Sequence, residues 1–284
     1  MGPNRTAGGV TIVEVVISAR RRGDERISRI RAWSVPASAI LGMSGAALYV
    51  YLLVEIVIGD VDRNVSFVSE LSARDQPHHL LFQAFDATAG ALIAVLGVGL
   101  GLLRCPGGRR AGAGWRWGCR CVVGFGLATV AVACLPLDCA ASASLACGLK
   151  EQSGRVSLVH HAHSVASALS TVGVIASVAL LGWSSKGRPG WRPMAWVSAA
   201  AFPVVSVLSA ALALLGLGWG LEDSESAGGH LRTVLGVGQR VELLVVAGWI
   251  GVLSACLLHA ARDPTLAVPG AEYLDGHVQD ERRG

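Results

Sequence analysis

The sequence predicts an all-α, polytopic membrane protein built as a bundle of six transmembrane helices. Of its 284 residues, 52% are hydrophobic and only 15% are charged, and the mean hydropathy is +0.52. A soluble domain carries about 25% charged residues. The apolar residues also gather in blocks of about 20, the length at which an α-helix crosses the bilayer core. Repeated segments of about ten residues with alternating hydrophobicity, the pattern of barrel strands, are not present, which favours helices over a transmembrane barrel.

Six blocks have this length and composition. They are Val35–Gly59, His79–Leu103, Cys121–Leu137, Ser157–Trp183, Met194–Gly220 and Val237–Ala261. Pro136 marks the end of the third block, and Pro203 inside the fifth predicts a kink, where Ser206 can bond the freed backbone. We therefore expect a basic cytoplasmic arm over residues 1–34, a six-helix domain over 35–261 and a disordered cytoplasmic tail over 262–284.

Basic residues are divided unevenly between the two sides of this bundle. The segments before the first block, after the second, after the fourth and after the sixth hold 18 of the 24 Lys and Arg residues. Because cytoplasmic segments are enriched in Lys and Arg, both termini are expected in the cytoplasm and the protein in the inner (plasma) membrane. Six tryptophans are expected to form an aromatic belt at the same boundary: Trp33, Trp115, Trp117, Trp183, Trp191 and Trp196. The net charge of +4 then reflects topology, and we expect no nucleic-acid partner.

Two cysteines lie in the second outer loop, in the stretch "DCAASASLAC". An oxidising compartment permits a disulfide there, and the short loop can bring Cys139 and Cys147 together. Two free thiols are the alternative.

Ionisable residues inside the blocks or next to them gather in the outer half of the predicted bundle. At about 1.5 Å per residue, Asp86 lies roughly 10 Å and His163 roughly 9 Å below the outer boundary. The other members of this set are Glu55, Asp138, Arg240 and Glu242. Intramembrane ionisable residues usually face the bundle interior or a water-filled cavity. The pattern therefore predicts one polar pocket that opens to the outer side.

The fourth block begins with "VSLVHHAHSVAS", and its spacing places His160, His163 and Ser164 on one helix face. Neutral imidazoles bind zinc and a carboxylate can complete the shell, so His160, His163 and Asp86 are candidate zinc ligands. Asp86 and His163 are also candidate catalytic acid/base residues. Arg240 can neutralise Glu55, Asp86 or Glu242. The alternative is a hydrogen-bonded polar cluster that only fixes helix packing.

Four stretches resemble a known bacterial family. "SELSARDQPHHLLFQAFDATAG", "LPLDC", "HHAHSVAS" and "GQRVELLVVAGWIGVL" are similar to multi-pass proteins catalogued as a domain of unknown function, and the similarity covers residues 35–261. The resemblance implies the same helical topology and singles out five site residues: Ser69, Asp86, Asp138, His163 and Arg240. It implies no activity.

A looser likeness connects the chain with seven-helix membrane hydrolases that hold zinc. Those proteins carry paired histidines in their last helix, whereas the last block here has no histidine at its outer end and the blocks number six.

Three functions remain open. The first is binding of, or catalysis on, lipids or envelope precursors through Asp86 and His163. The second is a small proton-coupled transporter, although an inner half with few polar groups and the lack of an inverted repeat count against it. The third is a non-catalytic protein that partners another membrane protein or a second copy of itself. Membrane lipids are an expected partner in each case.

Overall fold

The computed structural model describes residues 32–50, 67–103, 109–188, 190–218 and 225–263, and these residues form helices and loops without a strand. The elements are a helix over residues 32–49, the 3-10 helix η1 (Val68–Ser72), α3 (His79–Leu102), α4 (Arg109–Cys134), α5 (Leu145–Gln152), α6 (Leu158–Ser185), α7 (Arg192–Gly218) and α8 (Glu225–Arg262). The all-α prediction is therefore confirmed. Residues 1–31, residues 264–284 and the end of the first predicted block lie outside the described residues.

Five of the described helices are long and apolar enough to cross a membrane. They are α3, α4, α6, α7 and α8, and each falls on one of the predicted blocks. The helix over residues 32–49 lies in the first block. Because several membrane-crossing helices are present in one chain, the protein is a multi-pass membrane protein.

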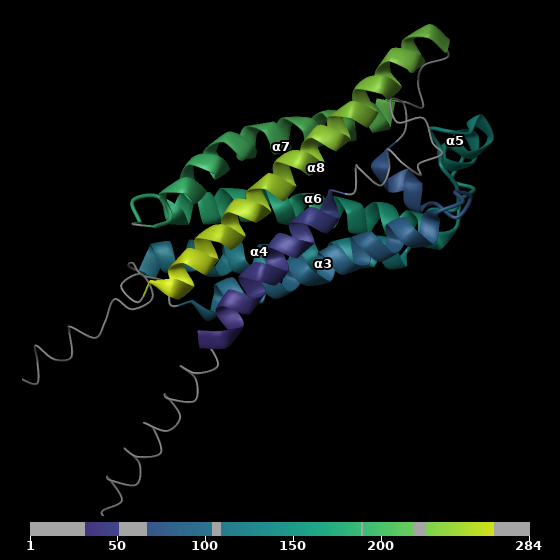
Figure 1. Cartoon of the computed structure of the whole chain (residues 1–284). Helices are drawn as coiled ribbons and strands as arrows, with labels where there is room; N and C mark the ends of the chain where they lie inside the picture. The colour runs from purple at the N-terminus through teal and green to yellow at the C-terminus, as the bar shows by residue number, and fades with distance from the viewer. Residues whose placement is uncertain (1–31, 51–66, 104–108, 189, 219–224, 264–284) are drawn as a thin grey trace, which may run out of the picture.

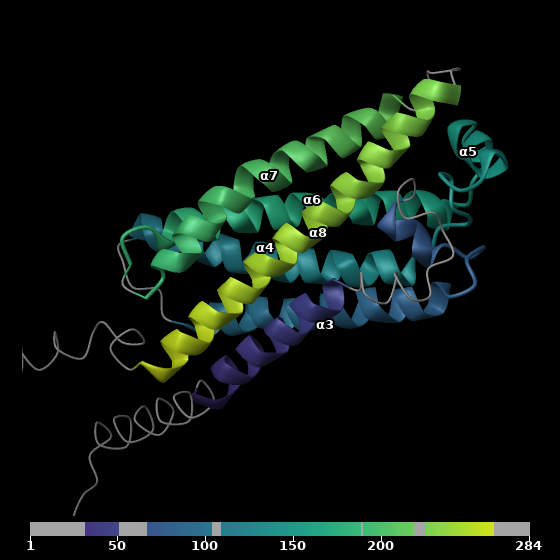
Figure 2. The same cartoon turned by 45° about the horizontal axis from the view of Figure 1, so that its top comes forward.

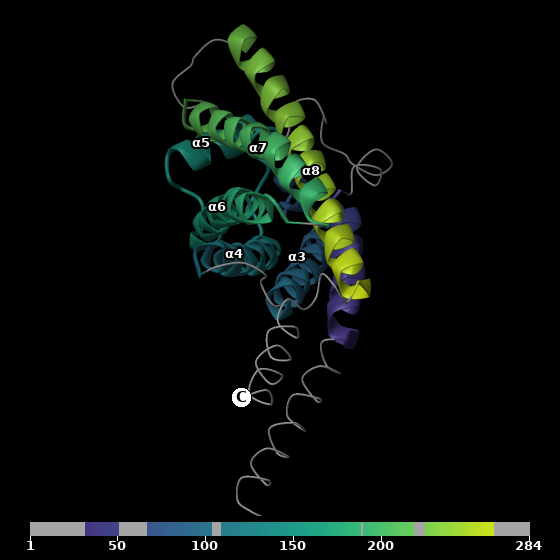
Figure 3. The ribbon, with the colours of Figure 1, turned by 90° about the vertical axis from the view of Figure 1, so that its left-hand side faces the viewer.

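The long helices form one elongated bundle (Figure 1). Contacts follow chain order: α3 packs on α4, α4 on α6, α6 on α7 and α7 on α8. α8 crosses the bundle obliquely (Figure 2), and the end-on view of Figure 3 shows the helix over residues 32–49 beside it, on the side away from α6. Short elements and loops over residues 67–78 and 135–157 gather at one end, which we call the polar cap.

Glycines allow the closest helix approach. A Cβ atom placed on Gly126 of α4 would lie 2.5 Å from the Gly90 carbonyl oxygen and 2.5 Å from the Ala94 amide nitrogen, both on α3. Only a residue without a side chain fits between two backbones at this separation.

The opposite end, which we call the basic end, comprises residues 112–120 and 183–192. It carries Arg116, Arg120, Lys186, Arg188 and Arg192. Four of the six expected belt tryptophans are exposed here or nearby: Trp33, Trp117, Trp183 and Trp196. The belt prediction is wrong for Trp115 and Trp191, which are buried and meet edge to face with ring centroids 4.8 Å apart.

The same pair explains why the third block was predicted to begin too late. α4 begins at Arg109 rather than near Cys121. Its first turns present buried Trp115 to the bundle while Arg116 and Arg120 remain exposed. A helix with one apolar face and one charged face has too low a mean hydropathy to stand out in the sequence.

Pro203 lies inside α7, as expected. The suggested role of Ser206 is wrong, because its buried hydroxyl has no hydrogen-bond partner among the residues that the structure describes.

Candidate functional site

The predicted site residues that the structure describes form two groups, according to the contacts they make. One group belongs to the polar cap and contains Asp138, His160 and His163. The other lies within the bundle and contains Asp86 and Glu242. Glu55, which we placed in the same pocket, lies outside the described residues.

In the polar cap, Asp138 fixes the start of α6. Its two carboxylate oxygens accept hydrogen bonds from the Ser157 amide at 2.6 Å and the Ser157 hydroxyl at 2.7 Å. Ser157 is the N-cap of α6, and its hydroxyl oxygen accepts from the His160 amide. Arg74 contributes a longer ion pair, with 3.9 Å between Nη1 and Oδ1. The Ser157 amide and hydroxyl hold the pKa of Asp138 below its usual range.

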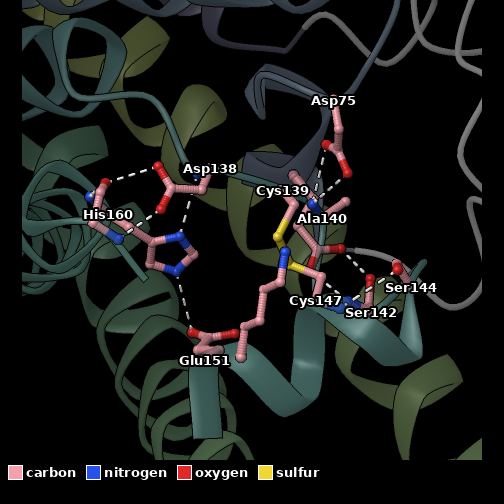
Figure 4. Close-up of a disulfide and its surroundings, with 12 residues drawn as sticks. Asp75, Asp138, Cys139, Ala140, Ser142, Ser144, Cys147, Glu151 and His160 are labelled. Carbon is pink, nitrogen blue, oxygen red and sulfur yellow. Dashed lines mark hydrogen bonds and ion pairs between the residues drawn. A yellow bond between two sulfur atoms is a disulfide. The ribbon is translucent and has the colours of Figure 1, made fainter. Parts of the chain in front are cut away.

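Both ring nitrogens of His160 are already engaged (Figure 4). Nδ1 accepts from the Asp138 amide at 3.3 Å, so the ring proton of neutral His160 lies on Nε2. Nε2 faces a Glu151 carboxylate oxygen at 3.4 Å. His160 is 2% exposed. It therefore joins the loop after α4, the last turn of α5 and the first turn of α6, and it offers no lone pair to a ligand in this arrangement.

His163 lies one turn deeper in α6 and is 3% exposed. Its Nδ1 lies 2.7 Å from the Leu135 carbonyl oxygen. Because a carbonyl can only accept, Nδ1 donates, and in the neutral ring Nε2 then carries the lone pair. Leu135 directly follows the end of α4, where backbone carbonyls lack helical partners. His163 thus caps α4 from the neighbouring helix.

Ser164 lies on the same helix, and its hydroxyl donates to the backbone carbonyl of His160, one turn earlier, at 3.3 Å. Ser69 likewise contributes a backbone carbonyl, which accepts from the Ser72 hydroxyl at 2.7 Å.

Three acidic residues of the polar cap were not recognised from the sequence. Glu70 is 3% exposed and accepts hydrogen bonds from both the amide and the hydroxyl of Ser142, and from the Phe67 amide. Burial raises the pKa of Glu70, although these donors act in the opposite direction. Both carboxylate oxygens of Asp75 lie 3.1 Å from the Ala140 amide, which donates to them. Glu151, the partner of His160, is the third.

The Cys139–Cys147 disulfide is formed in the structure and lies within the same network (Figure 4). It ties the loop after α4 to the middle of α5. Asp75 and Glu70 connect the flanks of this loop to the segment before α3. The polar cap is thus held by one covalent and several hydrogen-bonded links between segments distant in the chain.

The second group, the carboxylate cluster, comprises Asp86 on α3, Glu242 on α8 and Tyr49 at the end of the first described helix. Asp86 is 8% exposed. Asp86 and Glu242 each lie within electrostatic range of the Tyr49 hydroxyl. The Ser209 hydroxyl of α7 donates to Glu242. Four helices therefore contribute to the cluster.

Arg240 precedes Glu242 on α8, and its Nη1 donates to the Gly236 carbonyl one turn earlier at 2.8 Å. Gln239 on the same helix links α8 to the polar cap, because its side-chain oxygen accepts from the Val68 amide of η1 at 2.6 Å.

The zinc site suggested by the histidine spacing does not form among the described residues. They contain no group of three His, Cys, Asp or Glu side chains placed to hold a metal ion. The physical reason is visible at His160 and His163: helix spacing puts them on one face, but each ring turns toward a backbone group of the loop after α4.

A family profile matches most of the chain. Neither a curated protein nor a solved structure is significantly similar to the chain. The family profile described as "Protein of unknown function (DUF998)" matches residues 43–255, which extend from the first described helix to the last turns of α8. The match covers most of the chain and confirms the resemblance to a family of unknown function. The chain belongs to the DUF998 family.

Proposed function

We propose that this protein binds an amphipathic molecule, a lipid or an envelope precursor, at the carboxylate cluster. The observations that support the proposal are the Glu242 carboxylate on α8, which accepts a hydrogen bond from the Ser209 hydroxyl of α7, and the buried carboxylate of Asp86 on α3. Ionisable residues at this depth are costly and usually serve a function. Ionised carboxylates only accept hydrogen bonds, so a fitting head group supplies hydroxyl or ammonium donors.

The surroundings of Glu242 suit a ligand that arrives from the bilayer. On α8 its neighbours Val241 and Leu244 are 41% and 49% exposed. Its partner Ser209 lies two residues after Val207 of α7, which is 66% exposed. In a membrane such side chains contact acyl chains, so the apolar part of a lipid can lie along α7 and α8 while its head group reaches Glu242.

The proposed orientation places the basic end in the cytoplasm and the polar cap outside. Exposed Lys and Arg residues gather at the basic end, as cytoplasmic segments require. The Cys139–Cys147 disulfide lies at the other end, and disulfides persist in oxidising compartments. The two indications are independent and agree. The carboxylate cluster then lies in the outer half of the bilayer.

The test is mass spectrometry of lipids that copurify with the protein in mild detergent. Asp86→Asn and Glu242→Gln each remove a charged acceptor, a loss of about 1.5–3 kcal/mol, or roughly tenfold to a hundredfold in affinity. We expect the bound species to be depleted in both variants. Glu151→Gln is the control, because it removes a carboxylate of the polar cap. Equal amounts of bound lipid in all four proteins would rule out the proposal.

A second candidate function is stabilisation of another envelope protein without catalysis. His163 favours it, because this ring already caps the end of α4. On this hypothesis His163→Gln lowers the melting temperature in detergent and leaves copurified lipid unchanged. If His163→Gln loses bound lipid while its melting temperature is unchanged, His163 belongs to the ligand site instead.

A further inference from the structure

The short helix α5 has two unlike faces. Leu145 and Leu149 are spaced i, i+4, share one face and are 76% and 52% exposed. Cys147 projects from the opposite face, is 3% exposed and forms the disulfide with Cys139. The disulfide therefore determines which face of α5 is packed, and the leucines are left pointing away from the protein.

A contact in the last turn of α5 places this helix along the length of the bundle. Glu151 faces His160 in the first turn of α6 with 3.4 Å between the oxygen and Nε2. Leu158, the first residue of α6, is 82% exposed, so the apolar outer surface of α6 begins at this level. α5 thus lies where the lipid-facing surface of the bundle ends. Figure 1 shows α5 at the polar-cap end of the bundle, and Figure 3 shows it to one side of the bundle axis.

Basic side chains accompany the two leucines. Lys150 follows Leu149 directly, and Arg155 lies in the turn between α5 and α6; both are exposed. The acidic neighbour Glu151 is engaged with His160. An apolar face with basic residues beside it is the pattern of a helix that lies in the membrane interface and attracts anionic head groups.

The apolar face is small for a protein partner. α5 has eight residues and is therefore about 12 Å long. A stable protein interface buries about 800 Å² on each partner, far more than two leucines supply. A bilayer surface needs no such matched area, because acyl chains surround each inserted side chain.

We propose that α5 is an interfacial anchor that rests on the bilayer surface. Leu145 and Leu149 insert at the boundary between head groups and acyl chains, and Lys150 and Arg155 contact the phosphates of anionic lipids. The polar cap, to which α5 is tied by the disulfide and by Glu151, is thereby held at a set height above the membrane. This inference does not depend on the carboxylate cluster.

The experiment uses the full-length protein in vesicles of phosphatidylethanolamine and phosphatidylglycerol. A photoreactive phenylalanine derivative replaces Leu149 in one sample and Ser153, an exposed residue in the turn after α5, in the control. Neither position is buried, so both variants are expected to fold. After illumination, mass spectrometry identifies the molecules joined to each position.

We expect several-fold more lipid adducts at Leu149 than at Ser153. A second sample, in which phosphatidylcholine replaces phosphatidylglycerol, should give fewer adducts at Leu149. Equal yields at the two positions would overturn the proposal. So would adducts at Leu149 that are mainly protein, either a second copy of this chain or another polypeptide, because they would identify α5 as a protein-docking element.

Discussion

Replacing Gly126 with alanine adds one methyl group to a contact between two helix backbones. The new Cβ atom would lie 2.5 Å from the Gly90 carbonyl oxygen on α3. A relaxed contact between carbon and oxygen is about 3.4 Å. Backbone atoms cannot turn aside as a flexible side chain can. α3 and α4 must therefore separate locally by about 0.9 Å, the difference between these two distances.

This separation has a predictable energetic cost. A gap of about 0.5–1 Å removes a quarter to a half of the dispersion energy between facing atoms. Overpacking of a close contact costs about 1–3 kcal/mol, and we expect Gly126→Ala to lie in the upper part of that range. Gly90→Ala creates a similar clash, with its Cβ 2.6 Å from the Gly126 carbonyl oxygen. One displacement relieves both clashes, so the double variant should cost less than the sum of the two singles.

Gly124→Ala is the matched control in the same helix. A Cβ atom at Gly124 meets nothing within 4 Å. Because alanine favours helix over glycine by about 1 kcal/mol, this variant should be neutral or slightly more stable. Reversible unfolding in a series of detergent mixtures, followed by tryptophan fluorescence, measures the free energy of each variant. The packing argument is refuted if Gly126→Ala is as stable as Gly124→Ala.

Three further predictions concern the polar cap. The lowered pKa of Asp138 stabilises the folded protein at pH values above 3.8, the ordinary pKa of an aspartate. This stability is lost as the pH falls through the folded-state pKa. Asp138→Asn should therefore flatten the acid side of a curve of stability against pH. The raised pKa of Glu70 has the opposite effect on stability. Its stabilisation of the folded protein is complete below pH 4.5, the ordinary pKa of a glutamate, and is lost as the pH rises through the folded-state pKa. Glu70→Gln should therefore remove a decline in stability with rising pH. Cys139 and Cys147 are eight positions apart, and their loop predicts about 2.5 kcal/mol of stabilisation, so Cys147→Ser should increase hydrogen exchange in α5 while exchange in α3 stays unchanged.

The sequence predicted the bundle better than it predicted the site. Block boundaries agree with α3, α6 and α7 to within a few residues, because hydropathy alone separates these helices from their loops. The last block ends with α8, but α8 begins at Glu225, 12 residues before the predicted start at Val237. The start of α4 was predicted too late, because its first turns carry Trp115 on the buried face and arginines on the exposed face. η1 and α5 were not predicted, because short elements outside the spans leave no hydropathy signal.

Among site residues, the sequence identified the polar positions but not their partners. Asp138, His160 and His163 were expected to line one polar pocket, with the two histidines as candidate zinc ligands. Instead each of them bonds to a backbone group, of Ser157, Asp138 and Leu135 respectively. Glu70 was overlooked because the "SELS" stretch reads as an ordinary polar loop, and nothing in it signals burial.

The sequence by itself determined the class of protein, the helical bundle and the gathering of charge toward one end. These are properties of composition over about 20 consecutive residues, and they need no knowledge of contacts. Tertiary structure alone decided which polar groups satisfy one another. The hydrogen bond between Glu70 and Ser142 joins residues 72 positions apart, and that between Val68 and Gln239 joins residues 171 positions apart. Hydrogen bonds form only within a few tenths of an ångström of their ideal length, so the fold must first place the distant segments side by side.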